Sequence, residues 1–169
     1  MLKKEYSLLF IILIFTLFSC RQEEPDFEDI FGVQVTDLML QDEHGDYFGY
    51  FGEGYSGFVY SISGSEMEAI LNNVRSLDLP IKKEPLSKMN WTETPIKDNQ
   101  LEVKELSSNY YTKNGNFLEF QQNVEIALEK EGKNYYCYYY RKTEGNIIEI
   151  ELYVLDVDEN KIYIVKNSI

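Results

Sequence analysis

Few residues in this chain of 169 could perform acid–base or nucleophilic chemistry. Its one histidine, His44, lies in the run Asp42-Glu43-His44-Gly45-Asp46, and Cys137 lies far away in the sequence. Nucleophilic catalysis requires a nucleophile, a base and a group that orients the base. No Gly-x-Ser-x-Gly motif accompanies the single imidazole. The sequence therefore favours a protein that is not an enzyme, with no catalytic residue assigned.

Glu149 and Glu151 are a pair of carboxylates that could cleave a glycosidic bond, because such cleavage uses two carboxyl groups. Residues two apart on a strand share one face of the sheet. The same spacing is also typical of a solvated acidic face, which is the interpretation we adopt.

The acidic run around His44 is also the first candidate metal site, since carboxylates could bind calcium weakly. Zinc would require further histidines or cysteines. Residues 156–160 begin like an EF-hand loop, but Lys161 replaces the required glycine and Asn167 the bidentate glutamate. We interpret both segments as turns and expect no metal.

The string Gly52-Glu53-Gly54-Tyr55-Ser56-Gly57 matches the G-x-G-x-x-G pattern of dinucleotide-binding loops. That pattern binds pyrophosphate only where a helix begins at the loop. Here the β-forming residues 58–60 follow, so a glycine-rich start of a hairpin strand fits better. We expect no nucleotide or other cofactor.

Tyrosine is common, with 14 residues, and five tyrosines lie within 135–140 around Cys137. Rings therefore occupy both faces of one expected strand. If one face is exposed, Tyr135, Tyr138 and Tyr139, together with Trp91, could bind a protein or stack on a sugar. If both faces are covered, the same rings belong to the core. Periodicity does not decide between the two.

These residues must be positioned by an α+β fold. The expected strands before the helix cover residues 31–40 and 55–62, joined by a polar, glycine-rich turn region over 41–54. Ser65 and Glu68 form a capping box that predicts an amphipathic helix over about 66–76. Its apolar face comprises Met67, Ile70, Leu71 and Val74.

Residues 78–105 contain three prolines and Trp91, and they predict a long irregular connection. Alternating apolar residues then predict a β-meander over 124–129, 135–141, 148–154 and 162–165. The predicted order is ββ-α-irregular-ββββ. This is a single twisted antiparallel sheet of about six strands, with one amphipathic helix packed on one face.

The first twenty residues have the layout of a secretory signal peptide, with Lys3 and Lys4 before an apolar run over 8–18 and small Ser19 before Cys20. The apolar run is shorter than the ~20 residues that span a bilayer as a helix. A cleaved leader over 1–19 is therefore expected.

Leu17-Phe18-Ser19-Cys20 resembles the lipobox of bacterial lipoproteins. The resemblance implies that the leader is removed before Cys20, that Cys20 carries fatty chains such as palmitate, and that the protein is anchored to a membrane of the cell envelope. The acidic cluster that follows is similar to a surface-export signal, which favours the outer membrane or the cell surface. We expect a lipidated cysteine and flexible tether over 20–30 and a single domain over 31–169.

The net charge of the chain limits the kinds of partner that it is expected to bind. The chain has 16 basic and 29 acidic residues, and without Lys3, Lys4 and Glu5 the remainder has 14 and 28, a formal charge of −14. Nucleic acid is excluded because its phosphates would be repelled. A basic protein partner or a divalent cation fits the sign, and solubility alone also accounts for it.

The sequence thus predicts a lipid-anchored envelope protein that binds another protein. The Gly-x-Gly-Tyr loop, strand and capped helix are loosely similar to small uncharacterised bacterial domains, some of them toxin-immunity proteins, so an immunity or inhibitor role is one form. The alternatives are a carbohydrate-binding accessory protein and a hydrolase with an unrecognised carboxylate site. The hydrolase predicts a concave pocket that holds two or more carboxylates.

Overall fold

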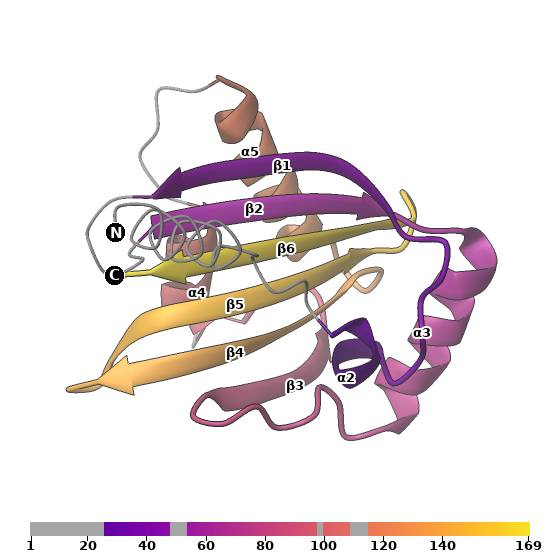
Figure 1. Cartoon of the computed structure of the whole chain (residues 1–169), viewed down its shortest axis with the longest axis horizontal. Helices are drawn as coiled ribbons and strands as arrows, with labels where there is room; N and C mark the ends of the chain where they lie inside the picture. Colours follow the sequence, from indigo (N-terminus) through magenta and orange to yellow (C-terminus); the bar gives the residue numbers. More distant parts are fainter. Residues whose placement is uncertain (1–25, 48–53, 98–99, 109–114) are drawn as a thin grey trace, which may run out of the picture.

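The structure of the protein is a computed structural model that describes residues 26–47, 54–97, 100–108 and 115–169 (Figure 1). Its six strands form one antiparallel sheet in the order β1-β2-β6-β5-β4-β3. The predicted α+β fold with a single six-stranded antiparallel sheet is confirmed. The elements are α2 Phe27–Phe31, β1 Met39–Tyr47, β2 Gly54–Ser61, α3 Gly64–Ser76, β3 Ser87–Glu93, α4 Leu101–Ser108, α5 Gly115–Glu129, β4 Tyr135–Thr143, β5 Asn146–Asp156 and β6 Lys161–Ser168.

The last three strands lie close to the predicted positions, at 135–143, 146–156 and 161–168. Strands β4 and β5 meet at a two-residue turn, in which Glu144 and Gly145 have φ values of 53° and 90°. Such left-handed pairs match the twist of a hairpin. Residues 157–160 turn the chain again between β5 and β6, so the EF-hand-like segment is a hairpin turn, as predicted.

Strand β1 lies further along the chain than predicted. The strand expected over 31–40 and the turn expected from 41 are wrong, because residues 39–47 form the strand and pair antiparallel with β2. Strand β1 is at the edge of the sheet, where polar side chains tolerate exposure. Its composition therefore resembles a turn, although the predicted hairpin with the second strand is present.

Helix α3 has the predicted apolar face, but its cap differs. Ser63, and not Ser65, is the N-cap, and its hydroxyl accepts a hydrogen bond from the Glu66 amide. Two Ser-x-x-Glu strings overlap here, at 63–66 and at 65–68. The Glu66 carboxylate accepts hydrogen bonds from the backbone amides of Thr36 and Asp37, which joins the helix to the preceding segment.

The strand predicted over 124–129 is wrong, because these residues end helix α5. Val124 and Leu128 suit either structure within a short window, whereas exposed Ile126 breaks the strand pattern. A window that begins at Phe117 shows helical spacing. The buried residues of the helix are Phe117, Phe120, Gln121, Val124, Ala127 and Leu128.

The irregular connection predicted over 78–105 contains two regular elements. Strand β3 is the other edge of the sheet, and its pairing with β4 shifts between Met89 and Thr92. This irregularity removes the alternation that marks a strand. Helix α4 follows and is only eight residues long.

The tether predicted over 20–30 includes residues that are folded. Asp26 caps helix α2, and Gly32 closes it in the left-handed conformation at φ 68°. Ile30 and Phe31 are buried. The charged residues Glu28 and Asp29, which lie between Phe27 and Ile30, hide this short apolar stripe from reasoning based on composition.

Helices pack on both faces of the sheet. This finding corrects the prediction of a single helix on one face. Helices α4 and α5 lie behind the sheet in Figure 1, and α2 and α3 pack at one end of the opposite face, which we call the front face. None of the helices in the described part of the chain lies over the remaining end of the front face, which is called the helix-free end below in this sense (Figure 1).

Candidate functional site

Strand register places polar residues side by side at the helix-free end of the front face. Ser56 of β2 pairs with Lys166 of β6, Lys166 with Glu151 of β5, and Glu151 with Tyr139 of β4. Two residues further along the strands, Glu149 pairs with Arg141 and with Ser168. Because residues two apart share a face, these two rows form one polar surface.

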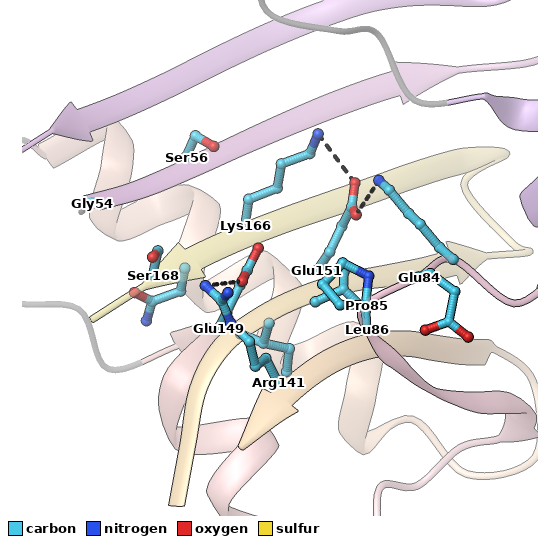
Figure 2. Close-up of a pocket in the computed structure, with 13 residues that line it drawn as sticks. Gly54, Ser56, Glu84, Pro85, Leu86, Arg141, Glu149, Glu151, Lys166 and Ser168 are labelled. Carbon is cyan, nitrogen blue, oxygen red and sulfur yellow. Dashed lines mark hydrogen bonds and ion pairs between the residues drawn. The ribbon is translucent and has the colours of Figure 1, made fainter. Parts of the chain in front are cut away.

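This surface is the floor of a hollow of about 460 Å³, and residues 83–86 form its rim (Figure 2). A volume of this size suits a small ligand or the end of a larger one. The hollow, defined by the two polar rows and this rim, is the candidate site and is called the charged hollow below.

Glu151 is the buried centre of the charged hollow, with only 6% of its surface exposed. Its Oε2 lies 3.1 Å from Lys83 Nζ, and its Oε1 lies 3.1 Å from Lys166 Nζ. The hydroxyl of Tyr153 donates to Oε1 at 2.7 Å. Burial acts to raise the pKa of Glu151, but the two ammonium groups and the hydroxyl outweigh it, so the pKa lies below its ordinary value.

The second ion pair of the hollow lies nearer to solvent. Arg141 Nη2 is 2.8 Å from Glu149 Oε2, and about half of the Arg141 side chain is exposed. Lys83 also lies over the ring of Tyr139, with Nζ 5.9 Å from the ring centroid. The cations of the hollow are therefore held both by carboxylates and by packing.

Hydrogen bonds attach Pro80 and Ile81, the segment before the rim, to the sheet and to helix α2. The Tyr139 hydroxyl donates to the carbonyl of Ile81, and the Ile81 amide donates to the carbonyl of Asp29 at 2.9 Å. Lys88 of β3 donates to the carbonyl of Pro80 at 2.8 Å. The segment that leads into the rim is thus attached to three different parts of the domain.

The hollow holds the two carboxylates that a hydrolase would need, but the environment of Glu151 does not suit a general acid. Glu149 and Glu151 share a face, as predicted, although Glu151 is buried and is not part of a solvated acidic surface. A general acid requires a raised pKa. Both oxygens of Glu151 are occupied and its pKa is lowered, so the carboxylate is suited to hold charge.

The four residues proposed as an aromatic binding surface lie in the core or pack on it. Tyr135, Tyr138 and Tyr139 are buried. Trp91 stacks on Phe31, with ring centroids 5.6 Å apart, and its Nε1 donates to the carbonyl of Ile30 at 3.0 Å. Of the two interpretations left open, the burial of the three tyrosines favours the sheet that is covered on both faces. Only Tyr139 reaches the charged hollow, through its hydroxyl and ring.

His44 lies on strand β1 and not in a turn. Its ring is buried against Phe117 and Phe120, and Nε2 lies 3.1 Å from Asp42 Oδ2. Cys137 is buried in the front core, so the sheet separates the imidazole from the thiol. Burial raises the pKa of Cys137 well above its usual range, which keeps the thiol protonated and unreactive.

The structure adds no support for a metal site. Within the described ranges, no group of three histidine, cysteine, aspartate or glutamate side chains is arranged to hold a metal ion. None of the helices in the same ranges has the length and apolarity needed to cross a membrane. The lipidation site predicted at Cys20 lies outside the described residues.

Sequence reasoning did not identify the three cations of the hollow, Lys83, Arg141 and Lys166. Of these, the position of Lys166 could have been inferred from a sequence pattern. The turn at 157–160 brings Glu151 opposite Lys166, so this pair could have been predicted from the hairpin. The approach of Lys83 depends on the fold of the connection after α3, which carries no periodic pattern.

Function must therefore be argued from this geometry. Comparison of the chain with protein-family models, with curated proteins and with solved structures finds no match.

Proposed function

We propose that the protein is a bacterial envelope lipoprotein, anchored through Cys20, whose domain binds another protein without catalysis. The observation that carries the binding role is the charged hollow at the helix-free end of the front face (Figure 2). An immunity or inhibitor protein is one concrete form of this function.

The hollow suits recognition because strands hold its charges in place. Lys166, Glu151 and Arg141 lie on adjacent strands, so their separations follow from register. Charged groups held in advance give specificity at little cost in conformational entropy. The acidity of the chain as a whole adds long-range attraction for a basic partner, and this attraction weakens with salt.

A retention experiment tests the binding role. The full chain, purified in detergent and immobilised, is exposed to envelope extract at about 0.05 M and about 0.5 M salt. We expect a specific protein to be retained at low salt and released at high salt. Retention of no protein at low salt contradicts the proposal.

A matched pair of variants locates the contact. Arg141→Gln removes a cation of the hollow, whereas Lys142→Gln removes the next cation on the strand, which lies over Tyr140 on the opposite face. Arg141→Gln should reduce retention, and Lys142→Gln should not. Equal retention by both variants would place the interface elsewhere.

The lipid anchor has its own test. Mass spectrometry of the native protein should show a chain that begins at Cys20 and carries fatty acyl groups. The variant Cys20→Ala should lose both the acyl groups and membrane association. An unmodified Cys20 in the native protein would exclude the anchor but leave the binding role standing.

A further inference from the structure

The two edges of the sheet differ in what lies beside them. At the β3 edge, the chain itself runs along the outer side of the strand, and the Trp91 amide donates to the carbonyl of Leu79 at 3.2 Å. The side chains of Lys88 and Asn90 both donate to the carboxylate of Asp78 in the same segment. The β3 edge is therefore closed to a further strand.

Strand β1 is the other edge and is the uppermost strand in Figure 1. Within the ranges that the structure describes, β2 alone pairs with it. The Glu43 amide donates to Asp42 Oδ1 at 2.9 Å, which places this amide outside the ladder with β2. Amide groups alternate in direction along an antiparallel strand, so the Gly45 amide is also directed to the open edge. The outer side of β1 thus presents backbone groups to solvent.

The stretch of β1 that is suited to a further strand begins at Asp42. The pairing with β2 shifts between Leu40 and Asp42, and such an irregularity bends the strand before that point. From there, residues 42–47 pair with β2 in continuous register. Gly45 is exposed, and a glycine inside a strand allows another backbone to approach closely.

The charge of this edge selects the kind of strand that fits it. Residues 39–47 include three acidic residues but no lysine, arginine or proline. The Asp42 side chain is 57% exposed, and Glu43 is exposed as well. Since successive side chains point to opposite faces, an added strand meets negative charge on both faces. A second copy of β1 would bring like charges together, which is destabilising.

We propose that β1 binds an extended, basic segment of a partner protein, which adds a seventh strand to the sheet. The backbone groups of the edge supply hydrogen bonds, and the carboxylates of Asp42 and Glu43 select lysine or arginine. The Glu43 amide then donates to a carbonyl of the added strand, so the Asp42 carboxylate becomes available to a basic side chain. This surface is separate from the charged hollow, and the inference goes beyond the proposed function.

The test is an NMR titration of the ¹⁵N-labelled full chain in detergent micelles with three short peptides. The first is acetyl-Thr-Lys-Lys-Val-Lys-Thr-amide, the second has glutamate in place of lysine, and the third is the first peptide with all backbone amides N-methylated. The basic peptide should shift the amide signals of Glu43 and Gly45 and slow the hydrogen exchange of these amides. The acidic and the N-methylated peptides should do neither.

Variants that keep the shape of the side chain test the role of charge. Asp42→Asn and Glu43→Gln should each weaken binding of the basic peptide about 1.5- to 5-fold, the effect of losing an opposite-charge pair across two strands. Glu68→Gln, at an exposed position of α3, is the matched control and should bind like the wild type. Arg141→Gln should also bind like the wild type, because strands β2, β6 and β5 lie between it and β1.

The inference is overturned if the basic peptide leaves the signals of Glu43 and Gly45 unchanged, since the acidic edge would then only deter aggregation. Equal binding of the acidic or the N-methylated peptide also overturns it, as does wild-type binding by both carboxylate variants. Signals that move with protein concentration in the absence of peptide would identify a second copy as the occupant. Loss of binding in Arg141→Gln would place the contact in the charged hollow. Protein retention from envelope extract together with a silent titration would leave the proposed function intact and remove only this inference.

Discussion

The two ends of the front face are formed by the same strands but have opposite chemistry. At one end, Cys137, Tyr153 and Ile164 lie within the core under α2 and α3. Two residues further along the same strands, Tyr139, Glu151 and Lys166 begin the charged hollow. One repeat of the strand pleat separates the two environments.

The comparison shows that a hollow can form where helices cover only part of a sheet face. Helix α2 has five residues and α3 has 13, and both pack at one end of the face. Where a helix covers the strands, apolar side chains gain free energy from burial. Tyr153 lies at the boundary of the two environments, since its ring is buried in the core and its hydroxyl donates to Glu151.

The largest expected effect is at the apolar end. Phe31→Ala removes a side chain that is 0% exposed and stacks against Phe27 and Trp91. It should lower the free energy of unfolding by about 3–5 kcal/mol, measured by urea denaturation. Arg141→Ala should lower it by less than about 1 kcal/mol. Similar losses for the two variants would mean that the charged end supports the fold as much as the core does.

An intermediate loss of stability is expected for a substitution of Glu151, which lies where the apolar core meets the charged hollow. Glu151→Gln keeps the shape of the side chain but loses the charge that binds Lys83 and Lys166. The free energy of unfolding should fall by about 1.5–3 kcal/mol, as for hydrogen bonds to charged groups. Glu149→Gln, at the more exposed ion pair, is the control and should cost less than about 1 kcal/mol. The reverse order would contradict the central place of Glu151.

The effect of Glu151 should also depend on pH. Its pKa in the folded protein lies below the ordinary 4.5, so its stabilising contribution is complete above about 4.5 and is lost as the pH falls through the folded value. The difference in unfolding free energy between wild type and Glu151→Gln should therefore shrink from about pH 6 to about pH 3. A difference that does not change over this interval would show that the ion pairs do not stabilise the charged form.

The smallest effect on stability is expected for the exposed ion pair between Arg141 and Glu149. A double-mutant cycle on Arg141 and Glu149 should give a coupling energy of about 0.2–1 kcal/mol that declines with salt. The Lys142–Glu102 pair on the other side of the sheet, at 3.9 Å, is a suitable comparison and should couple no more strongly. A much larger coupling in the first pair would indicate that it is structural and not available to a ligand.

The sequence predicted those parts of the fold in which local pattern and tertiary environment agree. Strands β4, β5 and β6 lie close to their predicted positions, and α3 has its predicted apolar face. Helix α5 was missed because Val124, Ile126 and Leu128 alternate over a short window, although Phe117 and Phe120 extend a helical spacing. Strand β1 was displaced because an edge strand carries turn-like polar residues.

The candidate site was less accessible to sequence reasoning. The pairing of Glu151 with Lys166 follows from a recognisable turn, but the burial of Tyr135 and Tyr138 depends on helices that pack on both faces. The contact of Lys83 with Glu151 joins residues 68 positions apart. Such a contact depends on the path of an aperiodic connection, which no local rule specifies.

The attachment of the rim has a kinetic consequence. Tyr139 and Lys88 donate hydrogen bonds to the segment before the rim, and the Ile81 amide donates to the carbonyl of Asp29, so Pro80 and Ile81 have little freedom to swing away from the sheet. A partner would therefore meet an already open cleft, and no gating motion would precede association. The association rate should follow collision frequency and electrostatic attraction, so differences among partners would arise mainly in how long each complex lasts.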